Sequence, residues 1–385
     1  MKRKTRKAVV HFALFFGALL LILVLNRPEA RGKKFAWDRV RYQTTATELP
    51  EARGICLGLA TTSKPALVVS RVSSDGDIKW SDGLSDLYHR CVYTADAPRD
   101  QTSAHLQVPE NRGHEAMGYL TFLIDNYDQI PDAGAVFVHG ARWAWHNDAP
   151  DYDNHSLLSR LNVTNALAVS GYHNLRCDWS LSTCPASSPP QGSLETSSQA
   201  YLSPWDYRAV SDSLLPVGLT AIFGGGQGPA AAAALDVYLG RTRTVRSQCC
   251  AQFVVSKQSI RRHSRAEYVA LRQWLLDGSR SGNNNNNSNY NKNAAPADDR
   301  IAGRILSYVW HILFITQSDS DVAAGVVSLE QLNSQACPRA DECYCRLYGR
   351  CNLEGCTAPG SCHGQYELPP KLMLPDDWAA THSGL

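Results

Sequence analysis

Several features are scarce in this chain of 385 residues, and each scarcity excludes a class of protein. Net charge is almost absent, because 38 lysines and arginines are balanced by 36 aspartates and glutamates. No basic stripe interleaved with aromatic residues occurs, so the chain lacks the electrostatic footprint of a nucleic-acid-binding protein. Charged residues make up 19% and hydrophobic ones 44%, which excludes a disordered chain and predicts a globular one. No internal repeat is visible, so no repeat architecture is indicated.

The amino terminus holds a long apolar run, AVVHFALFFGALLLILVL, from Ala8 to Leu25, after a tail with five lysines and arginines. At about 1.5 Å per helical residue the run is about long enough to cross a bilayer. A cleavable signal peptide has a shorter apolar core of roughly 7 to 15 residues, and NRPEARGKK offers a poor cleavage site. We predict a cytoplasmic tail over residues 1–7 and a transmembrane signal anchor over residues 8–25, with a cleaved signal peptide as the alternative. Such a single-pass type II protein would face the lumen of the ER or Golgi.

Cysteine usage agrees with a lumenal address. All 12 cysteines follow the apolar run, and half of them lie in the last fifty residues. In an oxidising compartment such a cluster predicts disulfides rather than zinc ligands. Cys249 and Cys250 are predicted not to bridge each other, because adjacent Cα atoms lie about 3.8 Å apart and a disulfide usually spans about 4.4 to 6.8 Å. Each is expected to pair with a distant cysteine or to stay buried and free.

The rest of the chain divides into a stem, one domain and a tail. Residues 26–64 are charged and patternless, which suits a stem, and residues 65–335 are predicted to form a lumenal α/β domain. Two low-complexity stretches, 224–234 and 281–297, cannot bury apolar area and are predicted to be surface insertions. Residues 336–385 form a cysteine-rich C-terminal extension. Sequons for N-glycosylation, which fit the same compartment, lie at Asn154, Asn162 and Asn286.

Strand and helix patterns alternate inside the predicted domain. Short apolar runs predict strands over residues 66–72, 88–96, 135–140 and 249–256. Apolar residues at three- and four-residue spacing predict helices, the clearest over residues 114–127 with Asn111 as its cap, and others over 265–276 and 305–314. This order predicts an α/β fold with a mostly parallel sheet covered by helices.

Polar side chains gather where the parallel strands are expected to end. In open α/β sheets, ligands bind at the carboxyl ends of the strands. Three segments should converge there and share one pocket: PENRGHE, HGARWAWHND and KQSIRRHSR. The candidate site residues are Asn111, Arg112 and Glu115 in the first segment, His139, Trp143, Trp145, His146 and Asp148 in the second, and Lys257, Arg261, Arg262 and Arg265 in the third.

This inventory matches what transfer from a nucleotide sugar to a glycan acceptor requires. A pyrophosphate leaving group needs a divalent cation or basic side chains to neutralise its charge. Asp148 with His139 and His146 would suit Mn or Mg, and the basic residues of the first and third segments would hold the phosphates. The two tryptophans would stack on a sugar ring. Glu115 or Asp148 would act as a base toward an acceptor hydroxyl.

Each of these residues also has a structural interpretation. His139 can be a hydrogen-bonded histidine at a strand end, the tryptophans can pack on the sheet, the basic loop can be a solvated turn, and Glu115 can complement the helix dipole. Two other functions stay open. His146 and Asp148 match the H-x-D half of an iron-binding facial triad, with His263 as a third ligand and Arg265 beyond it. A disulfide-stabilised adhesion or scaffold domain would need no catalytic site.

Five ordered blocks carry a family resemblance: PENRGHEAMGYLTFLIDNYDQIPDAGAVFVHG, SGYHNLRCDW, CCAQFVVS, RILSYVWHILF and ACPRADECYCRLYGRC. They resemble a largely fungal family catalogued as domain of unknown function 3431, over roughly residues 66–351. The resemblance implies membership and little chemistry. It implies that the motif positions are filled here by Asn111, Gly113, Glu115, Tyr119, His139, Trp145, His146, Cys177, Trp179, Cys249, Cys250, Gln252, Trp310 and the terminal cysteines. Ser307 stands where the family pattern is expected to have a glutamate.

A weaker similarity concerns sugar transfer. The N-R-G-H-E helix start, followed by a strand that ends at His139, is similar to the rhamnan-synthesis type of sugar transferase. The strand order is similar to nucleotide-sugar transferases of the GT-A class, so the resemblance implies a GT-A-like fold. The D-x-D of that class is absent from the loop after the strand, where His146, Asn147 and Asp148 are the nearest substitute.

Overall fold

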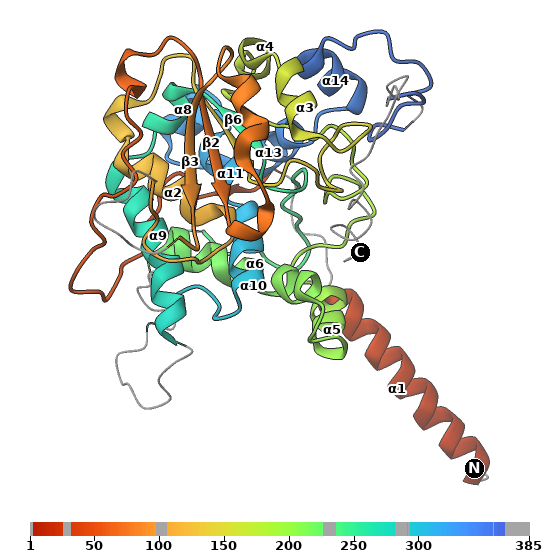
Figure 1. Ribbon diagram of the computed structural model, residues 1–385. Helices are drawn as coiled ribbons and strands as arrows, with labels where there is room; N and C mark the ends of the chain where they lie inside the picture. The colour runs from red at the N-terminus through yellow and green to blue at the C-terminus, as the bar shows by residue number, and fades with distance from the viewer. Residues whose placement is uncertain are drawn as a thin grey trace.

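The computed structural model describes residues 3–25, 32–97, 106–225, 236–281, 291, 293–356 and 358–365. Helix α1 (Arg3–Leu25) contains the apolar run and lies outside the folded domain (Figure 1). Its window Arg6–Val24 has a mean hydropathy of 2.4, and none of it is buried. The helix is therefore long and apolar enough to cross a membrane, a property that a signal anchor and a signal peptide share.

A sheet of five strands forms the centre of the domain, in the order β3 (His89–Thr94), β2 (Ala66–Arg71), β4 (Ala135–His139), β6 (Phe253–Val255) and β5 (Tyr172–Asn174). β2 pairs in parallel with β3 and β4, whereas β6 pairs antiparallel with β4 and β5. The sheet is thus mixed, and the mostly parallel sheet that the sequence predicted is not confirmed. Because β6 is reversed, its start lies at the edge where the other four strands end.

Helices cover both faces of this sheet, as predicted. Alternate residues of each central strand enter different cores, Ala135 and Phe137 on one face and Val136 and Val138 on the other. The first face packs against α2 (Glu115–Asp125), α9 (Arg265–Ser281) and α11 (Trp310–Phe314). The second packs against α3 (Asn154–Arg160), α4 (Val163–Leu167) and α14 (Ala340–Tyr348). Burial on both faces explains why these strands are continuously apolar.

Two further helices, α6 (Tyr207–Gly224) and α10 (Asp299–Ser307), pack together beyond the carboxyl ends of β2 and β3 (Figure 1). α6 contains Pro216, which removes one helical hydrogen bond and frees the carbonyl of Asp212. The Gly192 amide donates to that carbonyl at 3.0 Å, so the freed group is satisfied. α5 (Leu194–Leu202) packs on α6.

The remaining elements are β1 (Lys34–Phe35), β7 (Val327–Ser328), α8 (Lys257–Arg261), α12 (Asp319–Ala323), α13 (Leu329–Ala336), η1 (Leu59–Thr61), η2 (Ser73–Asp75), η3 (Ile78–Leu84) and η4 (Tyr127–Gln129).

The segment predicted as a stem, residues 26–64, belongs to the folded domain over its described part, residues 32–64. β1 pairs antiparallel with β7, and the rings of Phe35 and Trp37 stack at 4.1 Å with no exposed surface. The Trp37 indole also donates to the carbonyl of Val237 at 2.9 Å. Charged neighbours hide these apolar positions in the sequence, which is why the segment was interpreted as a stem.

All twelve cysteines are paired in six disulfides. The pairs are Cys56–Cys91, Cys177–Cys343, Cys184–Cys337, Cys249–Cys250, Cys345–Cys351 and Cys356–Cys362. Two of them join the region before β6 to the C-terminal region, so the predicted extension is part of the domain at least through α14.

The prediction that adjacent Cys249 and Cys250 do not bridge each other is wrong. Cys250 and the following Ala251 adopt left-handed backbone conformations, with φ of 84° and 46°, which accompany the bridge between neighbours.

Other boundaries differ from the sequence prediction. The helix predicted over 305–314 is two helices, α10 and α11, and the strand predicted over 249–256 is only Phe253–Val255. The N-cap position of helix α2 is occupied by His114 rather than Asn111, and the His114 side chain makes no capping hydrogen bond. Asn154 is fully buried and donates to Gln252, whereas Asn162 is exposed. Asn286 and most of both predicted insertions lie outside the described residues.

The disulfides Cys177–Cys343 and Cys184–Cys337 enclose nearly the same stretch of chain. With the second intact, replacing Cys177 and Cys343 by Ser opens an additional loop of about 13 residues, so we expect a loss of about 3 kcal/mol. The midpoint of thermal unfolding should fall by roughly 4 °C. Removal of both bridges should lower it by more than the two separate losses added together. Additive losses would contradict the nested arrangement.

Glu267 on α9 makes stability depend on acid pH. Burial raises the pKa of Glu267, but hydrogen bonds from His263 and Ser264 outweigh burial and lower that pKa to about 2, from 4.5. The ionised carboxylate therefore stabilises the folded state fully above about pH 5 and loses this effect as the pH falls toward 2. Between pH 7 and pH 3, the difference in unfolding free energy between the wild type and Glu267→Gln should shrink by about 2 kcal/mol. The same change at the exposed Glu330 should show no such pH dependence.

Candidate functional site

The edge at which β2, β3, β4 and β5 end, and at which β6 begins, brings together part of the predicted site. β4 ends at His139, and the chain turns from β2 toward Asp75. Glu115 begins α2, and residues 249–252 precede β6. Trp145 and His146 follow β4 in the chain and return to the same edge, where the His139 and His146 rings lie 4.7 Å apart.

A buried amide network fixes His139. Asn147 donates through Nδ2 to the carbonyls of Arg142 and Tyr152, at 3.2 and 2.9 Å, so its Oδ1 is the acceptor. That oxygen accepts from Gln252 Nε2 at 2.9 Å and lies 2.9 Å from His139 Nε2. His139 must therefore donate through Nε2, and in the neutral ring Nδ1 carries the lone pair. His139 is therefore a hydrogen-bonded histidine at a strand end, as its structural interpretation predicted, with Nε2 bound to Asn147. Its Nδ1 atom retains a lone pair that can accept a hydrogen bond.

His146 is held neutral beside this network. Burial, together with the neighbouring His139 and Arg176, lowers the pKa of His146 well below 6.5. Arg176 is itself buried and donates to the His146 carbonyl at 2.8 Å, which fixes the backbone there. A neutral imidazole can accept a hydrogen bond at one ring nitrogen and donate one from the other.

Asp75 is a site residue that the sequence prediction missed. Burial raises the pKa of Asp75; a hydrogen bond from the Val72 amide and the nearby His139 lower it, and Glu115 raises it. The pKa of Asp75 thus depends on a second carboxyl group, Glu115, and on a histidine at this edge. The signal was present in the sequence, because Asp75, Gly76 and Asp77 place two carboxylates shortly after a predicted strand.

A cleft of about 230 Å³ opens beside these groups, and we refer to it as the basic cleft. It lies between the start of α2, the segment before β6, and the helices α6 and α10. Its lining residues are His114, Glu115, Trp145, His146, Leu181, Ser182, Thr183, Tyr207, Arg208, Ser247, Gln248, Cys249, Cys250, Ala251, Arg300, Gly303, Arg304, Ser307 and Tyr308. The lining therefore contains three of the predicted site residues, Glu115, Trp145 and His146, together with Ser307.

The positive charge of the basic cleft comes from residues outside the predicted site. Arg208 lies 5.8 Å from the Trp145 ring centre, and Arg300 lies 5.7 Å from that of Tyr207. Both arginines are exposed, and Arg300 also pairs with Asp298 at 3.0 Å. Arg304 is bound to Asp212 at 3.1 Å. Residues 300 and 304 share one face of α10, a four-residue spacing that the sequence would have revealed.

The third predicted segment does not reach this edge. Because β6 runs antiparallel to β4, the chain leaves β6 at the opposite edge, where α8 lies (Figure 1). Lys257 pairs there with Asp132 at 2.6 Å, and Arg261 donates to the carbonyl of Asp128. The segment contains two further predicted residues, Arg262, which donates to the Ile315 carbonyl, and Arg265, which is exposed. The convergence predicted for this segment is therefore wrong.

Two residues of the first segment also lie apart from the cleft lining. Arg112 is buried and donates to the carbonyls of Pro296 and Ala297 and to Asp299. It therefore fastens the start of α2 to the start of α10. Asn111 is exposed on the surface beside it.

The Asp148 side chain holds two parts of the fold together. Its carboxylate accepts from the Cys177 amide at 2.6 Å, the Asp178 amide at 3.3 Å and the Tyr344 hydroxyl at 3.0 Å. It anchors the loop after β5 to α14 and does not line the basic cleft. Trp143 is outside the lining too, with the Arg142 guanidinium 4.3 Å from its ring centre.

The predicted metal ligands are not assembled. Among the described residues, one group of three His, Cys, Asp or Glu side chains has all its ligand atoms within 4.8 Å, namely Cys56, His89 and Cys91. Two of these are joined in a disulfide, which removes them as ligands. His139, His146 and Asp148 do not form such a group, so the residues present do not fit the predicted Mn or Mg site. The iron triad fails similarly, because both ring nitrogens of His263 are engaged, with Glu267 and the Leu313 carbonyl.

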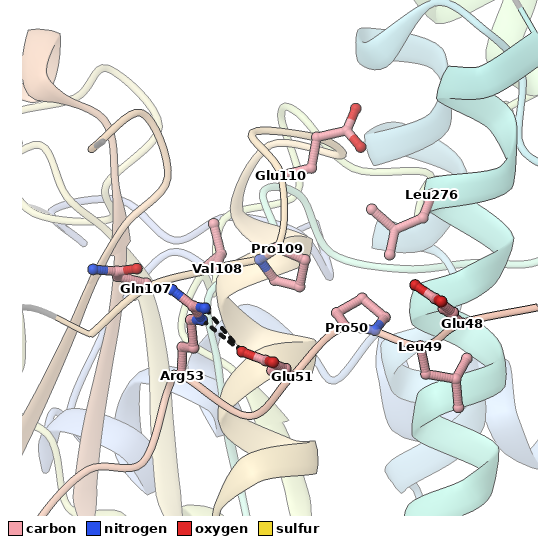
Figure 2. Close-up of a pocket in the computed structure, with 10 residues that line it drawn as sticks. All are labelled: Glu48, Leu49, Pro50, Glu51, Arg53, Gln107, Val108, Pro109, Glu110 and Leu276. Carbon is pink, nitrogen blue, oxygen red and sulfur yellow. Dashed lines mark hydrogen bonds and ion pairs between the residues drawn. The ribbon is translucent and has the colours of Figure 1, made fainter. Parts of the chain in front are cut away.

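A larger cavity, of about 600 Å³, lies between residues 48–53, residues 107–110 and α9 (Figure 2). Figure 2 shows Arg53 turned toward Glu51, with which it pairs at 2.8 Å. Glu48 and Glu110 add two further carboxylates to a lining that is otherwise mainly apolar. No residue of the predicted site lines this cavity, and its charge is wrong for a phosphate ligand.

Comparison with known proteins gives one match. A family model described as "Protein of unknown function (DUF3431)" matches residues 67–346. No curated protein and no solved structure matches the chain significantly.

The Asn147 network supplies a test of how this edge is held. Asn147→Asp would turn an oxygen toward the Arg142 and Tyr152 carbonyls, so we expect the free energy of unfolding at pH 8 to fall by about 2 to 4 kcal/mol. The loss should be smaller at pH 5, because a protonated carboxyl group can donate to one of these carbonyls. Denaturant titration at both pH values measures the effect, and Asn165→Asp, at an exposed position of α4, is the control, with a change below about 0.5 kcal/mol. An equal loss at both pH values would contradict the assigned amide orientation.

Proposed function

Because the chain belongs to the DUF3431 family, a membership that by itself carries no activity, we propose its function from the chemistry of the basic cleft. In this proposal the protein is a membrane-anchored, glycosyltransferase-like enzyme that faces the lumen and takes a nucleotide sugar as donor. The observation that carries the proposal is the meeting of arginines, aromatic rings and a carboxylate in one cleft at the carboxyl edge of the sheet. That edge is where α/β folds, the GT-A class among them, bind such ligands.

The arginines would hold the diphosphate. Charge that develops on a pyrophosphate leaving group must be neutralised, and Arg or Lys side chains can do this in place of a metal ion. Arg208 and Arg300 are exposed in the cleft lining, and Arg304, which pairs with Asp212, belongs to the same lining. The unsuitable geometry of the predicted metal ligands favours this arginine-based version over one that relies on Mn or Mg held by the protein.

The sugar and the acceptor would lie toward the sheet. Trp145 and Tyr207 offer partly exposed aromatic surface, on which the apolar face of a sugar ring can pack. Glu115 would take the proton from the acceptor hydroxyl. His146, neutral at physiological pH, would hydrogen-bond the donor or acceptor.

Two features of the chain support a lumenal compartment. The apolar helix α1 would anchor the protein, and six disulfides are consistent with an oxidising lumen. Residues 32–64 pack on the domain, so the catalytic unit would sit close to the membrane surface.

Direct binding tests the proposal. The full chain in detergent is titrated with UDP-glucose, UDP-N-acetylglucosamine, GDP-mannose and UDP, with and without EDTA, by calorimetry. We expect at least one nucleotide sugar to bind, EDTA to have little effect, and Arg300→Gln or Arg208→Gln to weaken binding by about 10- to 100-fold. Arg261→Gln, at the opposite edge, is the matched control and should bind normally. Absence of binding to all three nucleotide sugars would refute the proposal.

A second variant separates binding from turnover. Glu115→Gln should keep its affinity for the donor and lose at least about 100-fold in hydrolysis or transfer of the sugar, because it removes the base and leaves the cleft intact. An unchanged rate would remove Glu115 from the catalytic role.

A further inference from the structure

The Cys249–Cys250 disulfide lies in the wall of the basic cleft. Cys249, Cys250 and Ala251 line it together with Trp145 and Glu115. Both cysteines are partly exposed, unlike the fully buried pair Cys177 and Cys343. The disulfide therefore borders the space that a ligand would occupy.

This disulfide contributes little to holding the chain together. The other five join residues separated by 35, 166, 153, 6 and 6 positions, whereas this one joins neighbours. A cross-link stabilises mainly by closing a loop in the unfolded chain, and a bridge between adjacent residues closes almost none. Stability therefore does not account for its presence.

Unfavourable backbone conformations gather at the same wall. In the described part of the chain, four residues other than glycine have positive φ: His114, Tyr152, Cys250 and Ala251. Three of the four line the basic cleft. Such conformations cost free energy and persist where the surroundings impose them, commonly at ligand sites.

The bridged turn is also fastened to the sheet. Asn174, the last residue of β5, donates to the Cys249 carbonyl at 3.2 Å, and the Leu175 amide donates to the Gln252 carbonyl at 2.9 Å. Gln252 in turn belongs to the amide network of His139. The disulfide is thus a fixed surface rather than the tip of a loose loop.

We infer that the Cys249–Cys250 disulfide is a binding surface for the sugar ring of the donor, an inference that rests on the proposed function. Sulfur is polarisable and makes few demands for hydrogen bonds, so a disulfide offers an apolar patch to the C–H face of a sugar. The polar neighbours Ser247 and Gln248 flank it in the lining and can bond the hydroxyl groups at the ring edge. The patch contacts the sugar and leaves the diphosphate to the arginines.

The test compares two ligands on one variant. The full chain and the double variant Cys249→Ser, Cys250→Ser are titrated with UDP, and with whichever UDP-sugar the wild type binds best. We expect the double variant to bind the UDP-sugar about 10-fold more weakly and UDP with unchanged affinity. Equal affinities for the UDP-sugar, or equal losses for both ligands, would overturn the inference. If the wild type prefers GDP-mannose, that sugar and GDP replace the uridine pair in the comparison. If the wild type binds no nucleotide sugar, the proposed function fails first.

Stability and redox state supply the controls. The double variant should keep its unfolding midpoint within about 2 °C of wild type, because the bridge closes almost no loop. A fall as large as that of Cys177→Ser, Cys343→Ser, or failure to fold, would make the bridge a structural staple and overturn the inference. Mass spectrometry of the unreduced chain should find Cys249 and Cys250 protected from alkylation. Labelling of either thiol without reductant would contradict the bridge itself.

Discussion

The direction of one short strand determines which parts of the chain can form a site. β6 lies between β4 and β5 and runs against both. Its start, not its end, therefore faces the edge where β2 and β4 finish. This brings the Cys249–Gln252 segment into the basic cleft and sends α8, with its basic residues, to the other edge. A parallel β6 would exchange the two segments and would leave the cleft without its disulfide wall.

Buried amides convert that topology into fixed geometry. Asn147 has four hydrogen-bonding contacts, two to backbone carbonyls and one each to His139 and Gln252. These tie the segment after β4 to the segment before β6 across the sheet edge. Since buried polar groups are costly unless they are paired, the network has one satisfactory arrangement and restricts the two segments to it. Histidine tautomer and cleft shape are thus set by the same amide.

The sequence predicted the elements better than their directions. The strands at 66–72, 88–96 and 135–140 and the helix at 114–127 were found because burial gives clear apolar patterns. Glu115, Trp145 and His146 were placed in the same lining because they adjoin those elements. The reversal of β6 left no local trace, since a three-residue apolar strand reads the same in both directions. The structural role of Asp148 was equally hidden, because its partners lie about 30 and 196 residues away.

The near-neutral charge of the whole chain bears on how an anionic ligand could be held. A net charge of +2 on 385 residues gives no long-range field to attract phosphate, and charges more than about 8 Å apart are screened at physiological salt. Electrostatic attraction for a phosphate group would therefore have to come from arginines in direct contact with it. Those of the basic cleft stand on the packed helices α6 and α10, not on loops, and Arg112 and Asp299 fasten α10 to the start of α2. Their rigid placement compensates for the weak field, because side chains that are already in position lose less entropy when they bind.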